Sequence, residues 1–291
     1  MAKLYKVNPR SVDAIFEDNS IEAILIASST DTHSDFIEKA SIAGKAILCE
    51  KPVDLSLARA KRCLENTKSN EHLIMMGFNR RFDPNFVALK KALDGGEIGT
   101  AELLSITSFD PAPPPIDYVK VSGGIFKDMM IHDFDMANFL YGELPKSVFV
   151  SASAIIDKKI GALGDYDTAV ATLKYRDGRL AVIKNSRRAT YGYDQRIEVL
   201  GSKGLLQVQN MVENSMVKST EMGVESSKPE YFFLERYKSA YQNEWTAFVT
   251  AVKTKTPMPV SLSDGIAALA IAEAAAASAE TGSEVAIANF L

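Results

Sequence analysis

Two side chains capable of acid–base chemistry lie four residues apart near the middle of the chain. Asp128 and His132 follow the glycine pair Gly123-Gly124. On a helix, residues four apart share one face, and a carboxylate beside an imidazole orients the ring and tunes its basicity for proton transfer. Two adjacent glycines also let the backbone approach a neighbouring group closely. The spacing therefore indicates a catalytic pair.

Two other interpretations of this pair remain open on spacing alone. Asp128 fits the favourable electrostatics of a helix N-terminus, and His132 fits a hydrogen-bonded core position. Asp128, His132, Asp133 and Asp135 are also potential metal ligands. However, Asp133 directly follows His132 and points about 100° away from it around a helix. We therefore expect no metal site.

Composition places the chain among ordinary globular proteins. It has 291 residues, of which 46% are hydrophobic and 24% charged, a length that suits two modest domains or one large one. The net charge of −4 gives no electrostatic attraction to nucleic acid or to anionic membranes. Cys49 and Cys63 lack the spacing of a metal-binding pair and need no disulfide.

No segment predicts a membrane span or a secretory signal. The alanine-rich run from Gly265 to Ala279 comes nearest, but it carries Glu273 and predicts a packed helix of small residues. We therefore expect a cytoplasmic protein with neither membrane nor nucleic-acid partners.

Alternating strands and helices predict a parallel sheet in the first eighty residues. Apolar runs predict three strands, at 21–27, 46–49 and 73–77. The first run is almost wholly apolar, as in a strand buried on both faces. Ser11, Thr32 and Asp54 are predicted N-caps, and Gly44 predicts a left-handed helix stop. This order predicts a doubly wound α/β sheet.

Strands dominate the rest of the chain. Glycine turns at Arg176-Asp177-Gly178 and Gly201 to Gly204 predict two hairpins. The predicted strands are 103–108, 168–175, 179–185, 197–200 and 205–209, and the predicted helices are 85–92, one carrying His132, 235–253 and 264–280. We expect a mostly antiparallel, open sheet with helices on one face. The predicted domains are residues 1–80 and 81–291.

Five motifs in order resemble the Gfo/Idh/MocA oxidoreductase superfamily, and the resemblance runs through nearly the whole chain. The first three are Thr30-Asp31-Thr32-His33, Cys49-Glu50-Lys51-Pro52 and Gly77-Phe78-Asn79-Arg80-Arg81-Phe82-Asp83. The last two are Gly123-Gly124 with Asp128, His132 and Asp135, and Tyr191-Gly192-Tyr193-Asp194-Gln195-Arg196. The last motif and the proline-rich loop 110–115 are most similar to the inositol 2-dehydrogenase branch.

The resemblance implies a Rossmann-like nucleotide-binding domain, a substrate-binding and oligomerisation domain, and a catalytic set of Lys51, Asp128 and His132. In that pattern His132 is the general base and Lys51, often joined to Pro52 by a cis bond, stabilises negative charge on the reacting oxygen. Asp128 binds another hydroxyl or orients the base. The implied cofactor contacts are Thr30, His33, Glu50, Lys51 and Asn79. Candidate substrate contacts, each equally compatible with a structural role, are Arg81, Asp110, Tyr191 and Tyr241.

The implied reaction moves a hydride from a hydroxyl-bearing carbon of a cyclic polyol or sugar to NAD. Myo-inositol at position 2 is the expected substrate. The sequence does not distinguish NAD from NADP, since that preference is set by residues at the end of a strand that we do not find. The resemblance also implies a homodimer or homotetramer.

One departure from the family pattern concerns the glycine-rich turn. The family begins with a strand, a G-x-G-x-x-G turn, a helix and a strand ending in an acidic residue, and none of the 17 glycines falls in that pattern. Residues 1–6 resemble the tail of the next helix. We therefore expect an N-terminally incomplete Rossmann-like sheet that exposes strand 21–27 at an edge and binds NAD weakly. The alternative function is a catalytically silent polyol-binding or assembly subunit.

Overall fold

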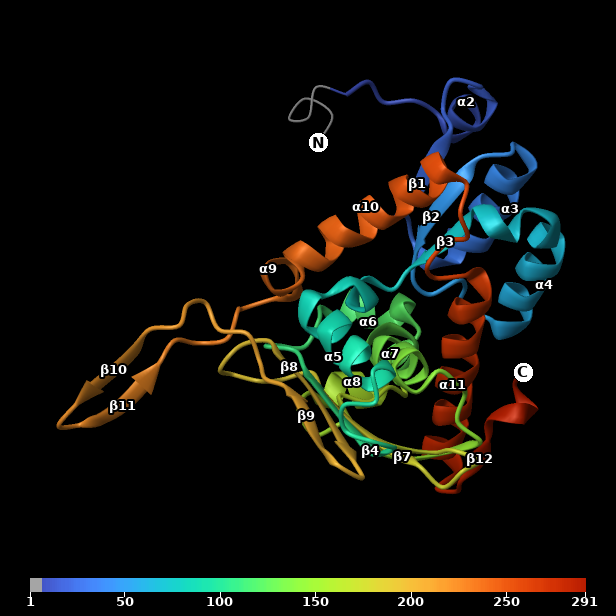
Figure 1. Ribbon diagram of the computed structural model, residues 1–291. Helices are drawn as coiled ribbons and strands as arrows, with labels where there is room; N and C mark the ends of the chain where they lie inside the picture. The colour runs from blue at the N-terminus through green and yellow to red at the C-terminus, as the bar shows by residue number, and fades with distance from the viewer. Residues whose placement is uncertain (1–6) are drawn as a thin grey trace. The chain divides into compact units, whose positions relative to one another are not determined.

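The computed structural model describes residues 7–291, which form two compact units (Figure 1). The first unit runs to Gly77 and adds Thr246–Gly265, and the second comprises Phe78–Trp245 and Ile266–Leu291. The predicted division at residue 80, which assigned 246–265 to the second domain, stays a prediction. The predicted helix tail at 1–6 lies outside the described residues.

The first unit is built on three parallel strands. Their bounds are Ala23–Ile26 (β1), Ala46–Glu50 (β2) and Ile74–Gly77 (β3), in the order β1-β2-β3. The helical segments are α2 (Val12–Glu17), η1 (Thr30–Thr32), α3 (His33–Ile42), α4 (Leu57–Thr67) and η2 (Lys68–Leu73). Within the described chain β1 pairs with β2 alone and Leu25 is 53% exposed, so the expected burial of this strand on both faces is wrong. The expected exposure along an edge is confirmed.

Two of the predicted helix N-caps are wrong, because each side chain makes its hydrogen bond within the turn that precedes the helix. The side chain of Asp54 accepts the Ser56 amide in the turn before α4, and Ser56 caps the helix by accepting the Arg59 amide. Thr32 makes no capping bond to α3. Its hydroxyl donates to the Ser29 carbonyl oxygen at 2.7 Å, closing η1 instead.

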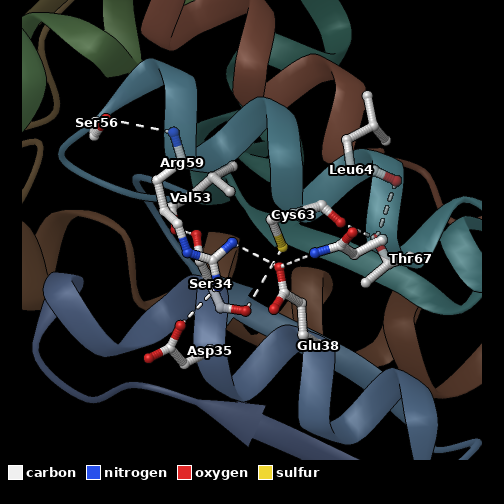
Figure 2. Close-up of polar contacts among 10 residues, drawn as sticks. Ser34, Asp35, Glu38, Val53, Ser56, Arg59, Cys63, Leu64 and Thr67 are labelled. Atoms are coloured by element: carbon white, nitrogen blue, oxygen red, sulfur yellow. Dashed lines mark hydrogen bonds and ion pairs between the residues drawn. The ribbon is translucent and has the colours of Figure 1, made fainter.

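Polar contacts join α3 to α4 (Figure 2). Arg59 donates to Glu38 and to Asp35, each at 2.6 Å. Cys63 is buried, and its thiol donates to the Ser34 carbonyl oxygen at 3.7 Å. Burial raises the pKa of the Cys63 thiol to about 12, so it stays protonated at neutral pH. Both cysteines are free and buried, as expected of a chain that needs no disulfide.

The second unit contains a seven-stranded mixed sheet in the order β12-β5-β6-β7-β4-β8-β9. The strands are β4 (Ala101–Phe109), β5 (Ser147–Ser153), β6 (Thr168–Lys174), β7 (Leu180–Ser186), β8 (Asp194–Gly201), β9 (Gly204–Val208) and β12 (Val285–Ala286). Only the β4–β7 pair is parallel, so the predicted mostly antiparallel sheet is confirmed. A separate hairpin, β10 (Val217–Thr220) with β11 (Gly223–Ser226), extends away from this sheet (Figure 1).

Helices of the second unit cover one face of the sheet (Figure 1). The helical segments of the second unit are η3 (Asn79–Phe82), α5 (Pro84–Asp94), α6 (Ile116–Ser122), the π-helical turn η4 (Phe126–Met130), α7 (Ile131–Tyr141), α8 (Lys158–Ala162), α9 (Phe233–Arg236) and η5 (Ile287–Asn289). Two further helices, α10 (Lys238–Thr254) and α11 (Leu262–Thr281), belong in part to each unit. The predicted helix 235–253 is interrupted at Tyr237. By length and composition α11 could cross a membrane. Its residues Ile271, Ala272 and Ala275 are fully buried in the core under the sheet, which is the ordinary reason for an apolar helix in a globular fold.

Candidate active site

Predicted cofactor residues of the first unit follow the carboxyl ends of parallel strands. Thr30 opens η1 after β1, and Lys51 directly follows β2, which ends at Glu50. The side chains of Thr30, Glu50 and Lys51 are partly buried. The carboxyl ends of parallel strands share one edge of a sheet, and ligands of open α/β sheets bind there. The Lys51–Pro52 peptide is cis, as the resemblance implies.

His33 is buried beside this edge and contacts the turns that follow β1 and β2. The ring is 1% exposed, with Nδ1 2.8 Å from the Pro52 carbonyl oxygen and Nε2 3.2 Å from that of Ser28. A carbonyl oxygen only accepts, so the ring donates to whichever neighbour faces its protonated nitrogen. His33 therefore ties the turn after β1 to the turn that carries Lys51. Its predicted contact with the cofactor stays a prediction.

The edge carries groups of the kind that contact a dinucleotide. It offers the Thr30 hydroxyl, the Glu50 carboxylate and the Lys51 ammonium, groups that pair with ribose hydroxyls and phosphates. Burial raises the pKa of Glu50, while the Lys51 charge and amide act in the opposite direction. A Cβ at Gly77 would lie 3.1 Å from Glu50 Cα and 3.3 Å from Oε2. A glycine at the end of β3 thus leaves room for the carboxylate, and Thr30, Glu50 and Lys51 fit the ribose and phosphate groups of NAD.

In the second unit, Asp128 lies in the π-helical turn η4. The Tyr118 hydroxyl donates to Asp128 Oδ1 at 2.8 Å, and Arg187 Nη2 lies 3.7 Å from Oδ2. A π-helix closes i→i+5 bonds, so the single α-helix predicted through Asp128 and His132 is wrong at residues 126–130. Both oxygens of this carboxylate therefore face a fixed donor or cation.

His132 is the second residue of α7 and is partly buried. Its ring and the ring of Phe78 pack edge to face, with centroids 6.0 Å apart and planes at 84°. Edge-to-face packing of this kind limits rotation of the imidazole. A held imidazole at neutral pH is suited to accept a proton.

Asp110 follows β4 and contributes a second acidic group near Asp128. Burial raises the pKa of Asp110 to about 6; the Arg187 charge lowers it and the Asp128 charge raises it. Its backbone is fixed, because its amide donates to the Ser186 carbonyl and its carbonyl accepts the Ala189 amide. A carboxyl group with this pKa can exchange a proton near neutral pH. The structure thus places the predicted residues Asp110 and Asp128 in one electrostatic cluster.

The remaining predicted substrate residues have protein partners or core positions. Arg81 makes two hydrogen bonds to Asp135, Nε to Oδ2 at 2.9 Å and Nη2 to Oδ1 at 2.6 Å. Tyr191 is 50% exposed and its hydroxyl donates to Asp194 at 2.6 Å. Tyr241 is partly buried on α10 and packs against the core. Their roles in substrate binding stay predictions.

A buried polar network lies beside this cluster. Arg80 donates to Asp133 at 2.5 Å and to Ser108 at 3.1 Å, and Asn185 donates to the other Asp133 oxygen at 2.8 Å. The predicted cofactor residue Asn79 precedes Arg80 in η3 and is 3% exposed. Among residues 7–291 no three His, Cys, Asp or Glu side chains gather as a metal site.

Sequence reasoning missed Tyr118, Asp165 and Arg187. Arg187 pairs with Asp128, 59 residues earlier in the chain, and with Asp165, 22 residues earlier. No local spacing signals such contacts. The one available sign was Gly123-Gly124: the expected close approach is confirmed, since a Cβ at Gly124 would lie 2.7 Å from Asp165 Oδ1.

Gly124→Ala is expected to lower the free energy of unfolding by roughly 2–3 kcal/mol, from left-handed backbone strain plus displacement of Asp165. Gly124 has φ +80°. The matched control is Gly142→Ala, because Gly142 has φ +70° with nothing within 4 Å of the added methyl. That control carries the backbone cost alone, about 1–2 kcal/mol. Urea denaturation compares the two, and equal losses would contradict the proposed contact.

Comparisons with known proteins agree with this geometry. The oxidoreductase-family NAD-binding Rossmann fold matches residues 2–78, and the GFO/IDH/MocA C-terminal domain matches residues 86–207. An inositol 2-dehydrogenase of Rhizobium meliloti is 48% identical, over 99% of this chain and 87% of its own. The crystal structure of a myo-inositol dehydrogenase from Corynebacterium glutamicum is 40% identical, with TM-score 0.93 over 96% of this chain and 84% of that one. A scyllo-inositol dehydrogenase of Lactobacillus casei, solved with NAD(H) and scyllo-inositol, is 27% identical with TM-score 0.91, over 99% of this chain and 87% of that one.

Proposed function

The chain belongs to the GFO/IDH/MocA family of NAD-dependent oxidoreductases, and from this premise we propose that it oxidises a ring hydroxyl of an inositol, myo-inositol at position 2 first among them. The observation that carries the proposal is the pair of carboxylates Asp110 and Asp128, which share the charge of Arg187, with the Tyr118 hydroxyl donating to Asp128. A polyol offers several hydroxyl donors, and carboxylates are strong acceptors for them.

Each proposed residue performs one step in this reaction. His132 accepts the hydroxyl proton of the substrate. Lys51 donates a hydrogen bond to the same oxygen and stabilises the negative charge that develops on it. Asp128 accepts a hydrogen bond from a neighbouring hydroxyl and so orients the ring. Thr30, Glu50 and Lys51 are suited to hold NAD⁺, which when bound would accept the hydride.

The function is tested by following NADH formation with myo-inositol, scyllo-inositol and glucose as separate substrates. We expect myo-inositol to give the highest kcat/KM and NADP⁺ to replace NAD⁺ poorly. A parallel calorimetric titration with NAD⁺ measures cofactor affinity. Saturable NAD⁺ binding without turnover of any of these polyols would contradict the proposal and favour a silent binding subunit.

We also propose that the protein assembles as a homodimer or homotetramer through the outer face of the seven-stranded sheet. Four exposed leucines line up across neighbouring strands of that face: Leu205, Leu200, Leu103 and Leu180. Each is 37–45% exposed. A continuous apolar row is characteristic of a contact surface, and the same row on a second copy is its simplest complement. The two free, buried thiols support a reducing, cytoplasmic location.

Leu200→Glu is expected to shift the protein toward smaller species, because it places a charge at the centre of the leucine row. The matched control is Val87→Glu on α5, where the replaced side chain is 45% exposed, like the 44% of Leu200. Analytical ultracentrifugation across a concentration series measures the distribution. An unchanged assembly in Leu200→Glu, or a wild-type monomer, would contradict this interface.

A further inference from the structure

We propose that Arg187 is a positioning residue that, by bridging Asp128 and Asp165, holds the π-helical turn in the geometry from which Asp128 binds substrate. This inference rests on the role of Asp128 in the proposed function. Arg187 directly follows β7, and its backbone amide donates to the Asp167 carbonyl at 2.8 Å. The main chain at this position is therefore anchored to the sheet.

The burial of Arg187 requires opposite charges close by. The residue is 1% exposed, and a guanidinium keeps its charge in a protein. A buried charge is tolerated only when it is paired. A single nitrogen, Nη2, lies 3.7 Å from Asp128 Oδ2 and 3.6 Å from Asp165 Oδ2. Arg187 thus connects the proposed substrate carboxylate to a carboxylate on a separate loop.

Asp165 also binds the backbone at the start of the π-helical turn η4. Its Oδ1 accepts the Ile125 amide at 2.9 Å, and Ile125 is the residue from which η4 begins. Gly124, one residue earlier, has φ +80°, and a Cβ there would collide with Asp165 Oδ1. The contacts form a closed path from Arg187 to Asp165, to the start of η4, to Asp128 and back to Arg187.

The path explains why Asp128 has one orientation. Tyr118 donates to Oδ1 while Arg187 faces Oδ2, so rotation of the carboxylate would break one contact or the other. An isolated π turn is a rare geometry that surrounding structure must hold. A structural ion pair needs only one acidic partner for Arg187. Here a second acid, Asp165, also accepts the backbone amide of Ile125, three residues before Asp128.

Arg187 also acts on Asp110. The Arg187 charge is the largest influence that lowers the pKa of Asp110, which burial raises to about 6. The charged groups around this carboxyl are Arg187, Asp128, Arg80 and Asp133. Loss of Arg187 therefore raises the pKa of Asp110 further, so this carboxyl stays protonated to a higher pH. The acid limb of the pH–rate profile should move in the same direction.

The test compares Arg187→Met with Arg187→Lys and with Arg188→Met, which removes the same charge from the exposed neighbour. We expect Arg187→Met to lower kcat for myo-inositol on the order of a hundredfold, as misplacement of a catalytic group by about 1 Å does. Its KM for NAD⁺ should stay within about twofold of wild type. Arg187→Lys should restore part of the rate, since it keeps the charge but loses the fork.

A double-mutant cycle tests the connection itself. Asp165→Asn keeps an acceptor for the Ile125 amide but removes the charge. If the two residues act as one unit, the double variant Arg187→Met/Asp165→Asn loses no more kcat than the worse single variant. Independent losses that multiply would overturn the proposal. Should Arg187→Met fail to fold, the cycle is run with Arg187→Lys.

A readout that needs no turnover separates this inference from the proposed function. Hydrogen exchange of the amides in residues 125–130 should accelerate at least about tenfold in Arg187→Met and remain unchanged in Arg188→Met. A wild-type chain that does not oxidise inositols would contradict the proposed function, and the exchange rates would still decide the role of Arg187. Arg187→Met with the exchange, kcat and pH profile of Arg188→Met would overturn it.

Discussion

His132→Gln is expected to lower kcat for myo-inositol oxidation by about a hundredfold to ten-thousandfold, the usual contribution of a positioned general base. Glutamine fills similar space and keeps a hydrogen-bonding end, but it cannot take a proton at neutral pH. The ring that it replaces is held against Phe78 at the start of α7. If His132→Gln lowers kcat while the protein stays folded, the loss is therefore attributable to proton transfer.

Steady-state NADH formation measures this loss, and thermal unfolding confirms that the variant is folded. His72→Gln is the matched control, since His72 is exposed in η2 of the first unit and should leave kcat unchanged. Retention of more than about a tenth of the wild-type kcat in His132→Gln would remove His132 from the role of general base.

Arg80→Met should lower the free energy of unfolding by about 3–5 kcal/mol, the cost of leaving a buried charge without its partner. Arg80 and Asp133 have side chains 6% and 0% exposed, and they meet at 2.5 Å. After the substitution Asp133 keeps its bonds from Ser108 and Asn185 but loses the guanidinium with which it is paired. These two neutral donors still stabilise the Asp133 carboxylate in part, and so they limit the loss in the free energy of unfolding.

Urea denaturation measures the change, with Lys120→Met as control. Lys120 pairs with Asp117 at 2.7 Å, but these side chains are 53% and 92% exposed, so that variant should lose at most about 1 kcal/mol. A loss below about 1 kcal/mol in Arg80→Met would mean that the buried pair is offset by its desolvation, as can happen for buried ions. The buried network around Asp133 is therefore tested by the sign of the change in the free energy of unfolding and by the ratio of the change in Arg80→Met to that in Lys120→Met.

Local patterns in the sequence were sufficient for most of the secondary structure. Ser11 caps α2 by accepting the Ala14 amide, and Gly44 ends α3 with φ +66°, both as predicted. These features depend on side chains and backbone within four residues of each other. The caps at Thr32 and Asp54 failed for a related reason, because a neighbouring turn competed for the same side chain.

The family, its cofactor and its reaction class were also accessible from the sequence, because five motifs occur in order at the ends of predicted strands. Lys51, Asp128 and His132 were named on that basis, and their catalytic roles stay predictions until the variants are measured. The site predictions were weaker for Arg81 and Tyr191. Their roles in substrate binding stay predictions, and their partners Asp135 and Asp194 became visible only in three dimensions.

What the sequence determined by itself is therefore the strands and helices of the first unit, most of the strands of the second unit, and the chemical types available at the site. Strand β5 (Ser147–Ser153) and the short strands β10 to β12 were not predicted. Only the tertiary structure decided how Asp128 is held. Tyr118, Asp165 and Arg187 come from three separate segments. Their contacts depend on the register of β6 with β7, which brings Asp165 and Arg187 together, and on a π turn that no spacing predicts. The physical reason is that hydrophobic periodicity reports which face of an element is buried, whereas the partner of a buried charge is chosen by the packing of distant elements.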